Sequence, residues 1–343
     1  MQNVKDSSIE IFVPGRLCLF GEHSDWASEY RKYNKNIEKG YTLVATINQG
    51  IRARVKKSKD FKFSFEDKNI TSKMSIKKLK EYEFSDEFLS CVIETAKYML
   101  NTYKVEGIDI NITEMDLPIG VGLSSSSAIC VLVVKAFNKL YNLNIEIKKI
   151  MDIAYISERN ANLKCGKMDH VCALGEGLVK MEFDGEITIE KIKNKNKLYF
   201  VFCIIKQKNT RKILDILNKS YPNINSENDR LIQATFGDIN KEIVSKAIKY
   251  IEDGYINKLG KLMFDSQKIF DKNIAPSLGE EFEEVNLHKI IKNKDVKKLI
   301  LGAKGVGSHG DGAVQFLVKN KENQEKLIET LHKLDYKAYK LDI

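Results

Sequence analysis

Residues 118–128, Pro-Ile-Gly-Val-Gly-Leu-Ser-Ser-Ser-Ser-Ala, run without a break into the apolar stretch 128–137. Gly120 and Gly122 allow the backbone to turn tightly and to approach a ligand, because no Cβ stands in the way. The serines that follow lie at the expected start of a helix, where backbone N–H groups and the helix dipole favour a bound anion. This combination predicts a loop that cradles the phosphates of a triphosphate.

Two other interpretations of this run are weaker. A flexible Gly/Ser linker is not followed directly by a long apolar stretch, so a loop that opens a buried helix fits better. A phosphate loop of the Walker type requires Gly-Lys-Ser/Thr, and that signature does not follow here.

The composition, with 43% hydrophobic and 30% charged residues, describes a globular protein rather than a disordered one. A length of 343 residues suggests two domains. No stretch approaches the roughly 18 apolar residues of a membrane span, and residues 1–8 lack the apolar core of a signal peptide. We therefore expect a soluble, cytoplasmic protein without a membrane partner.

Six cysteines and a net charge of +9 bear on metals and partners. The cysteines form no Cys-x-x-Cys pair and mostly lie in apolar runs, which favours reduced, buried thiols over disulfides or zinc ligands. The lysines are spread along the chain without a compact block interleaved with aromatics, so a solvated surface is favoured over a nucleic-acid site. Positive charge also suits an enzyme that handles phosphorylated compounds.

Hydrophobic periodicity predicts the order of the secondary-structure elements. In the first half we expect strands at 9–19, 41–47, 51–56 and 108–112, a polar surface excursion at 58–80, helices at 84–103 and directly after the Gly/Ser loop, and a helix at 146–160 that buries Ile150, Ile153, Ala154 and Ile156. Beyond it we expect a strand with Val179, Met181 and Phe183 alternating, a boundary segment at 191–197, a strand at 198–205, three helical segments between 226 and 294, and a strand–loop–strand–helix–strand ending.

Residues 14–26 read Pro-Gly-Arg-Leu-Cys-Leu-Phe-Gly-Glu-His-Ser-Asp-Trp. The apolar positions place Arg16 on a buried strand, and the glycine turn then brings Glu22, His23 and Asp25 close together. Four ionisable groups beside a buried strand end are costly unless they pair or bind something. Donors and acceptors grouped in this way suit a polyhydroxylated ligand. The alternative, a turn with solvated charges, would not require Gly-Glu-His after so apolar a strand.

A third segment joins Glu158, near the end of a predicted helix, to residues 165–174, Cys-Gly-Lys-Met-Asp-His-Val-Cys-Ala-Leu. Glu158 offers hard oxygen ligands that suit Mg²⁺. Asp169 follows a glycine break in a mostly apolar run, where its carboxylate can accept a proton from a substrate hydroxyl. Buried capping aspartates are common, so this segment gains weight only from the other segments.

Residues 302–317 form a fourth segment, a glycine-rich loop that leads into a strand. The residues expected to form the loop are Lys304, Gly305, Gly307, Ser308, Gly310 and Gly312. A glycine-rich loop alone is poor evidence of function. Its position after the three other segments makes it good evidence.

The first, second and last motifs along the chain resemble, in order, the three motifs of the GHMP kinases, the superfamily of galactokinase, mevalonate kinase and homoserine kinase. The resemblance spans nearly the whole chain. It implies an α+β protein with the two-domain GHMP kinase fold. An N-terminal α/β domain of the ribosomal-protein-S5-like type would cover residues 1–195, and a C-terminal ferredoxin-like domain residues 196–343. ATP and a small-molecule substrate would bind between them.

Within the superfamily the chain looks most like the galactokinase-like sugar kinases, whose first motif reads Gly-Arg-x-Asn-Leu-Ile-Gly-Glu-His-x-Asp-Tyr. The chain has Cys18 in place of the asparagine and Trp26 in place of the tyrosine. Residues 165–170 similarly resemble the motif Cys-Gly-x-Met-Asp-Gln. The resemblance implies these roles: Asp169 as the catalytic aspartate with Arg16 as its partner; Glu22, His23, Asp25 and Tyr221 as sugar ligands; Pro118, Gly120, Gly122, Leu123, Ser124, Ser125, Ser126, Ser127 and Ala128 around ATP; and Ser126 and Glu158 on Mg²⁺.

The expected activity is transfer of the γ-phosphoryl group of ATP to a sugar hydroxyl, at the anomeric position of galactose or a related hexose or uronic acid. We expect a monomer or homodimer that binds no nucleic acid. One alternative is a mevalonate-type kinase for a non-sugar alcohol, although such kinases usually lack the counterpart of Asp25. Another is a non-catalytic sugar sensor, which the intact Arg16, Glu158 and Asp169 disfavour.

Three departures from the galactokinase pattern leave the sugar open. About ten extra residues, 29–39, follow the sugar motif and include Arg31, Lys32 and Lys35. Arg31 in this insertion could hold the carboxylate of an acidic sugar, and a solvated surface loop is the alternative. His309 and Asp311 stand in the glycine-rich loop where relatives usually have glycine. The chain is also shorter than most galactokinases.

Overall fold

The computed structural model describes residues 8–66, 70–74, 79, 87–206, 210–279, 282 and 285–343. The chain divides into two compact units: a first unit of Met1–Gly15, Gln49–Ile119 and Leu123–Gly175, and a second unit of Arg16–Asn48, Gly120–Gly122 and Glu176–Ile343. This division by compactness does not follow the expected boundary at residues 195/196, and that domain boundary stays a prediction. The mixture of helices and sheets confirms the α+β class.

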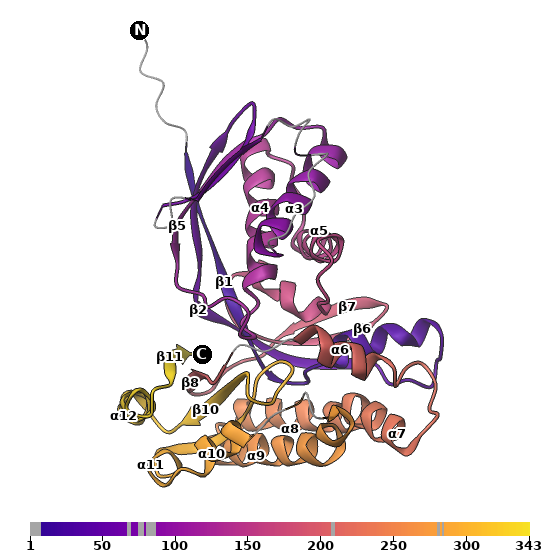
Figure 1. Cartoon of the computed structure of the whole chain (residues 1–343), viewed down its shortest axis with the longest axis vertical. Helices are drawn as coiled ribbons and strands as arrows, with labels where there is room; N and C mark the ends of the chain where they lie inside the picture. Colours follow the sequence, from indigo (N-terminus) through magenta and orange to yellow (C-terminus); the bar gives the residue numbers. More distant parts are fainter. Residues whose placement is uncertain are drawn as a thin grey trace. The chain divides into compact units, whose positions relative to one another are not determined.

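The first unit combines a sheet with three long helices. Its strands are β3 (Phe61–Phe65), β4 (Ile70–Met74), β5 (Ile108–Met115), the first part of β1 (Ile9–Phe20) and the second part of β2 (Gly40–Lys57). The strand order is β4-β3-β5-β2, with β1 paired to β2. Figure 1 shows α3 (Glu87–Tyr103), α4 (Ser125–Tyr141) and α5 (Ile147–Asn160) together on one side of these strands. The 3₁₀ helix η2 (Lys167–Leu174) packs against α4 and α5.

Two expectations about this region were wrong. The strands expected at 41–47 and 51–56 are one strand, β2, because the polar residues between them keep an extended backbone. The excursion expected at 58–80 contains β3 and β4. Phe61, Phe63 and Phe65 alternate inward on β3 and are buried, so the period-2 pattern holds beneath the lysine-rich composition. Residues 67–69, 75–78 and 80–86, which belong to the expected excursion and helix start, lie outside the described residues.

Helix α4 is buried nearly all round, as its composition predicts, and α5 follows its prediction except at one position. On α5, Ile150, Ala154 and Glu158 follow one another at intervals of four residues and are buried. Ile156 was expected on this face, but its exposed fraction is 38%. The apolar pattern favours Ile156 for the buried face, but the last turn of the helix buries a carboxylate, Glu158, instead. A pattern of apolar residues cannot identify a buried charged residue.

The second unit has its own sheet and most of the remaining helices. The first part of β2 pairs with β6 (Leu178–Asp184), which pairs with β7 (Glu186–Lys191). A separate antiparallel sheet has the order β11-β8-β10-β9, formed by β8 (Tyr199–Ile204), β9 (Ile300–Gly305), β10 (Ala313–Val318) and β11 (Lys337–Asp342). Its helices are α1 (Ser24–Ala27), α6 (Thr210–Asn218), α7 (Glu227–Ala234), α8 (Asn240–Asp253), α9 (Ile256–Asn273), α10 (Val285–Lys292), α11 (Lys294–Lys297) and α12 (Lys321–Lys333).

The predicted strand–loop–strand–helix–strand ending is confirmed by β9, β10, α12 and β11. The three helical segments expected between 226 and 294 are too few: α7 and α8 are separated by a π-helical turn at Thr235–Ile239, and α9 and α10 follow. Helix α6 was not expected. Helix α9 lies close on β9 because a Cβ on Gly260 would come within 2.3 Å of the carbonyl oxygen of Leu301.

The core of the second sheet is apolar and includes Val201, Cys203, Val314 and Phe316 with Leu327 from α12. All six cysteines are buried, as their apolar sequence surroundings predict, and none is bridged. Among the described residues, no helix is both long and apolar enough to cross a bilayer.

Candidate active site

The Gly/Ser loop has the left-handed turns that its glycines permit. Gly120 and Gly122 have φ of 73° and 90°, and Ser124 has φ of 61° immediately before α4 begins at Ser125. Arg16 Nη1 donates a 2.6 Å hydrogen bond to the carbonyl oxygen of Gly122. The Ser124 hydroxyl is buried and has no hydrogen-bond partner among the described residues. A strained serine with an unused hydroxyl at a helix N-terminus is the local arrangement expected of an anion-binding loop.

Glu158 is a buried carboxylate of the first unit with three polar neighbours. Ser126 Oγ donates to its Oε1 at 2.6 Å and Ser127 Oγ to its Oε2 at 2.7 Å, and His170 Nε2 lies 2.9 Å from Oε2. Burial by itself raises the pKa of Glu158, but His170 and the two hydroxyls outweigh it and hold the pKa below its usual value. The predicted Mg²⁺ ligands Ser126 and Glu158 are thus brought together, and the carboxylate is kept ionised.

The predicted catalytic pair belongs to different units. Asp169 lies half-buried in the first turn of η2 in the first unit. Arg16 lies on β1 in the second unit and is 4% exposed. Their partnership, and the role of each residue, therefore stay predictions.

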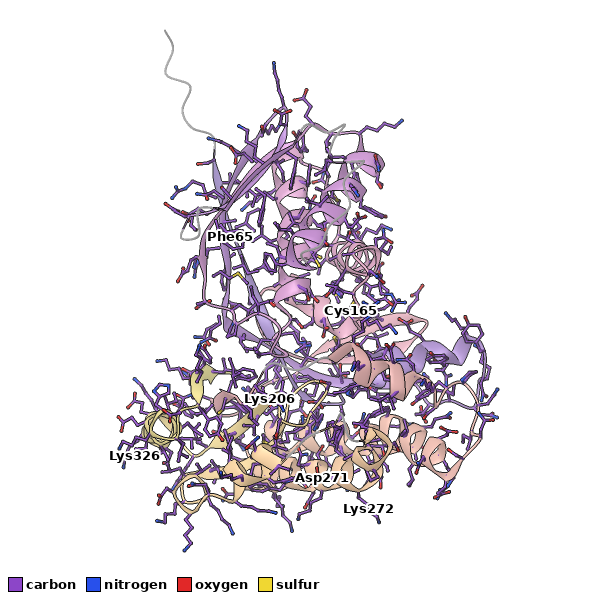
Figure 2. The ribbon with its side chains drawn as sticks, viewed as in Figure 1. Phe65, Cys165, Lys206, Asp271, Lys272 and Lys326 are labelled. Atoms are coloured by element: carbon purple, nitrogen blue, oxygen red, sulfur yellow. The ribbon has the colours of Figure 1, made fainter. Side chains whose placement is uncertain are left out.

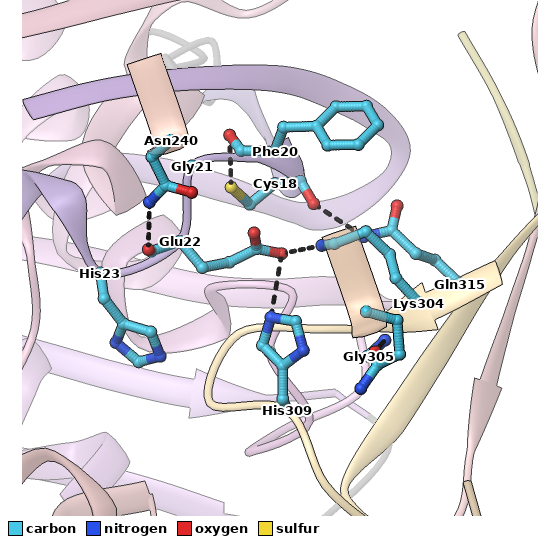
Figure 3. Close-up of polar contacts among 12 residues, drawn as sticks. Cys18, Phe20, Gly21, Glu22, His23, Asn240, Lys304, Gly305, His309 and Gln315 are labelled. Carbon is cyan, nitrogen blue, oxygen red and sulfur yellow. Dashed lines mark hydrogen bonds and ion pairs between the residues drawn. The ribbon is translucent and has the colours of Figure 1, made fainter. Parts of the chain in front are cut away.

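Glu22 lies at the centre of a buried polar cluster in the second unit (Figure 3). Its carboxylate forms an ion pair with the ammonium of Lys304, a residue of β9 with no exposed surface. His309 Nε2 lies 4.0 Å from Glu22 Oε1, and Asn240 Nδ2 donates to the Glu22 carbonyl at 3.3 Å. The cluster fixes Glu22 through groups from β9, the glycine-rich loop and α8.

His23 and Tyr221 meet within a group of aromatic rings. Trp26 Nε1 donates a 3.1 Å hydrogen bond to His23 Nδ1, and the ring of Phe236 lies 5.0 Å from the imidazole. Tyr221 stacks on Tyr30 at 5.1 Å and meets Trp26 edge-on at 5.6 Å. Burial, followed by the proximity of Tyr30, raises the pKa of Tyr221 far above its usual value. The structure thus brings two predicted sugar ligands, His23 and Tyr221, to the same aromatic group.

A small cavity adjoins these residues within the second unit. Glu22, His23 and His309 supply its ionisable groups, and Phe236 and Phe270 supply its apolar walls. The imidazole of His309 stacks on Phe270 at 3.9 Å with nearly parallel planes. Asp25, the remaining predicted sugar ligand of the first motif, is 1% exposed in α1.

The insertion at residues 29–39 is tied into the second unit. Arg31 Nε donates to Asp184 Oδ1 at 2.9 Å, and Arg31 Nη1 also bonds the Ile37 carbonyl. Lys39 Nζ lies 3.1 Å from Asp184 Oδ2. Ile37 is buried in the apolar cluster that contains Phe270. These contacts give the insertion a structural role and provide no support for Arg31 as a carboxylate receptor.

The glycine-rich loop contains two residues, His309 and Asp311, where relatives usually have glycine, and the structure shows what each of them contacts. Asp311 is buried, and its carboxylate accepts hydrogen bonds from the backbone N–H groups of Asn286 at 3.2 Å and Leu287 at 2.8 Å in the first turn of α10. Asp311 therefore caps a helix. His309 has φ of 59° and packs on Phe270. The loop residues Gly305, Gly307, Ser308, Gly310 and Gly312 lie at and after the end of β9.

Sequence reasoning missed three contributors to these clusters. His170 lies within residues 165–174 and has no predicted role, although it stands where the related motif has glutamine. Lys304 is expected in the glycine-rich loop without a contact of its own, and the structure places it in β9 with its ammonium paired to Glu22. Asn240 carries no local signal, because an asparagine at the start of a helix is common and its contact with Glu22 is long-range.

Comparisons with known proteins agree with the sequence motifs. Residues 90–177 match the family described as GHMP kinases N terminal domain. The chain is 24% identical over 352 residues to a galactokinase of Thermotoga maritima, covering 95% of this chain and 94% of that protein. The structure resembles a Methanococcus jannaschii mevalonate kinase (TM-score 0.75, 23% identity, 98% of each chain covered) and a Lactococcus lactis galactokinase complexed with galactose (TM-score 0.76, 17% identity, covering 98% of this chain and 94% of the other). The predicted resemblance to the GHMP kinases, and among them to galactokinases, is confirmed along nearly the whole chain.

Proposed function

We propose that this chain is an ATP-dependent sugar kinase that phosphorylates the anomeric hydroxyl of galactose or a related hexose. Similarity to galactokinases along nearly the whole chain indicates a phosphotransferase with an alcohol group as acceptor. The identity of the phosphoryl acceptor as a sugar is the part that we propose. It is supported by similarity to galactokinases along nearly the whole chain and by the chemistry of the residues that follow β1.

The observation that carries the sugar assignment is the burial of Glu22, His23 and Asp25 together directly after β1. Two carboxylates and an imidazole within four residues supply acceptors and a donor at adjacent positions, which suits several neighbouring hydroxyl groups. An alcohol with few hydroxyl groups would use only part of this set.

The residues around Glu158 fit Mg²⁺, the ion that kinases of this kind use with ATP. Two hard oxygen donors, Ser126 Oγ and Glu158 Oε1, lie 2.6 Å apart, and Ser126 is partly exposed to solvent. When bound, Mg²⁺ would neutralise charge on the ATP phosphates. Ser126 and Glu158 would hold it, and the backbone from Gly120 to Ser127 would orient the phosphates.

Phosphoryl transfer depends mainly on positioning and on neutralising charge. In the proposed mechanism Asp169 accepts the proton of the attacking sugar hydroxyl or orients that hydroxyl. Arg16 stabilises the negative charge that develops on the transferred group. Its 2.6 Å hydrogen bond to the Gly122 carbonyl would hold the guanidinium against the phosphate loop.

A mevalonate-type activity is the second candidate, because a mevalonate kinase resembles this chain about as well as a galactokinase does. Asp25 favours a sugar over mevalonate as the substrate, because mevalonate-type kinases usually lack the counterpart of this aspartate. A uronic acid is the weaker choice among sugars, since Arg31, the group that would recognise its carboxylate, bonds Asp184 and Ile37. A non-catalytic sugar sensor would leave the retained Arg16, Glu158 and Asp169 without a role.

A substrate panel tests this proposal. ATP consumption by the purified full chain would be measured with Mg²⁺ and galactose, other neutral hexoses, amino sugars, uronic acids and mevalonate. We expect the highest kcat/KM for a neutral hexose, and ³¹P NMR should identify the product as a sugar 1-phosphate. Turnover of mevalonate alone would overturn the sugar assignment, and sugar binding without ATP consumption would establish the sensor instead.

A further inference from the structure

Three side chains of different donor chemistry lie together at the end of α5, within the first unit. Glu158 lies on α5, Cys165 precedes η2 and is labelled in Figure 2, and His170 lies within η2. One ligand atom of each lies within 4.8 Å of those of the other two, and all three side chains are buried. A carboxylate oxygen, a thiol sulfur and an imidazole nitrogen are thus gathered at one point.

His170 has bonding capacity that the described residues do not use. Its Nε2 lies 2.9 Å from Glu158 Oε2, whereas its buried Nδ1 has no hydrogen-bond partner among the described residues. The ring of Tyr155 packs edge-on against the imidazole, with 5.7 Å between ring centroids, and restricts its rotation. A fully buried imidazole with an unused nitrogen is costly unless a ligand or water completes its bonding.

We propose that Glu158, Cys165 and His170 form a binding site for a borderline-soft divalent cation of the Zn²⁺ type. Such ions bind thiolate, imidazole and carboxylate in tetrahedral geometry at about 2.0–2.3 Å, which places the donor atoms about 3.3–3.8 Å apart. The donor atoms, now within 4.8 Å of one another, need to close by about 1.5 Å at most, a movement within the reach of side-chain rotation. Three protein ligands leave the fourth position for water or an added ligand.

The donor set distinguishes this site from the proposed Mg²⁺ site. Mg²⁺ requires oxygen ligands in octahedral geometry, whereas Cys165 and His170 supply sulfur and nitrogen. The two oxygens of Glu158 also differ: Oε1 accepts from Ser126, and Oε2 faces His170. One carboxylate therefore borders two sites of different chemistry.

Cation binding at this cluster must release a proton. Burial, with a further contribution from the negative charge of Glu158, raises the pKa of the Cys165 thiol well above its usual value. A cysteine thiol is ordinarily protonated at neutral pH and binds a cation of this kind as the thiolate. As the metal–sulfur bond forms, the S–H bond breaks and its proton passes to the buffer, which leaves a thiolate and a carboxylate to balance the dication.

A consequence for turnover rests on the proposed function. A cation on Oε2 withdraws negative charge from the carboxylate that we assign to Mg²⁺. Zn²⁺ should then raise the Mg²⁺ concentration needed for half-maximal turnover. Cation binding does not depend on the kinase assignment. An experiment can therefore reject the cation site without rejecting the proposed function, or the reverse.

Cobalt titration tests the site directly. The full chain would be treated with chelator under reducing conditions, freed of chelator and titrated with Co²⁺, with the absorption spectrum recorded and Zn²⁺ added last. We expect a thiolate-to-cobalt charge-transfer band with tetrahedral ligand-field bands, both abolished by Zn²⁺. Calorimetry in two buffers of different ionisation enthalpy should show release of about one proton per ion.

Two variants and one control assign the ligands. Cys165→Ser should abolish the charge-transfer band. His170→Gln should weaken binding by roughly 100-fold or more, since even outer-shell changes cost 10–100-fold. Cys172→Ser removes another buried cysteine of η2 that is not in the cluster and should leave the spectrum unchanged. Circular dichroism would confirm folding of each variant, and either ligand variant suffices if the other does not fold.

The outcomes separate clearly. No thiolate band in the wild-type chain, or a band that persists in Cys165→Ser, would overturn the proposal. Wild-type affinity in His170→Gln would remove the imidazole from the site and overturn the three-ligand assignment. A chain that binds Co²⁺ as described but turns over no sugar would retain the metal site and reject the proposed function.

Discussion

The indole Nε1 of Trp26 donates a 3.1 Å hydrogen bond to Nδ1 of His23. Because Nδ1 accepts this bond, a neutral His23 carries its proton on Nε2. Trp26 stands where the related sugar-kinase motif has tyrosine. The indole therefore sets the tautomer of a predicted sugar ligand and makes its Nε2 a hydrogen-bond donor.

Trp26→Phe should release this constraint. In ¹⁵N NMR spectra of histidine-labelled protein, with His23 assigned through His23→Gln, the wild type should show the Nε2–H tautomer and the variant a mixture of tautomers. Loss of one hydrogen bond worth about 1 kcal/mol should lower kcat/KM for the sugar about fivefold. Tyr30→Phe, which removes a hydroxyl bonded to Asn218 in the same aromatic group, is the control and should not alter the tautomer. A proton on Nδ1 in the wild type would contradict this account.

Asp169→Asn and Arg16→Ala should each lower turnover by a factor of about 10² or more, through loss of a proton acceptor and of a charge stabiliser. Steady-state rates of the folded variants, measured with saturating ATP, check this. Asp295→Asn, which changes an aspartate in an exposed surface ion pair, should keep the wild-type rate. If folded Asp169→Asn retained near wild-type turnover, the proposed role of this carboxylate would be wrong.

Lys304→Met should destabilise the fold by about 3–5 kcal/mol, because it leaves the Glu22 carboxylate buried without its ion-pair partner. The double variant Lys304→Met with Glu22→Gln should recover much of this loss, because no charge remains buried. Urea unfolding of the four proteins gives the coupling free energy. The same double-mutant cycle on the exposed pair Lys246 and Glu242 should give a coupling free energy of less than about 1 kcal/mol. Equal coupling in the two cycles would exclude a special role for the buried pair.

Asp311→Ala should lower the free energy of unfolding by about 2–3 kcal/mol, because it removes the acceptor for backbone N–H groups in the first turn of α10. Thermal and urea unfolding measure the effect. Asp295→Ala, at an exposed ion pair on the neighbouring α11, should change stability by less than about 0.5 kcal/mol. A kinetic defect in Asp311→Ala without loss of stability would instead place this carboxylate in the chemistry.

Asp184 gives the stability of the insertion region a pH dependence of known sign. Hydrogen bonds from Lys39 and then Arg31 lower the pKa of Asp184. A lowered folded-state pKa means that the stabilisation is complete above the unfolded value, near 3.9, and is lost as the pH falls through the folded value. Asp184→Asn should thus be less stable than wild type at neutral pH and should approach it at the acidic end. A constant difference across this range would show that Asp184 does not act through its charge.

Much of the fold follows from local patterns. The apolar run of β1, the all-round hydrophobicity of α4 and the alternating Val179, Met181 and Phe183 of β6 each specify an element through the period of their buried positions. The pattern fails where a buried position is polar. Helix α5 buries Glu158 instead of Ile156, because the charge is stabilised by hydroxyls and an imidazole from other elements.

The sequence by itself determined the resemblance to the GHMP kinases and supplied the candidate phosphate loop and candidate sugar and Mg²⁺ ligands, because these are carried by short contiguous motifs. Only the tertiary structure decided how those residues are partnered. Lys304 reaches Glu22 across 282 positions, and Asp311 caps α10 from a loop that follows it in the chain. Such contacts carry no local signal, since they depend on which strand ends and helix ends the fold brings within hydrogen-bonding distance.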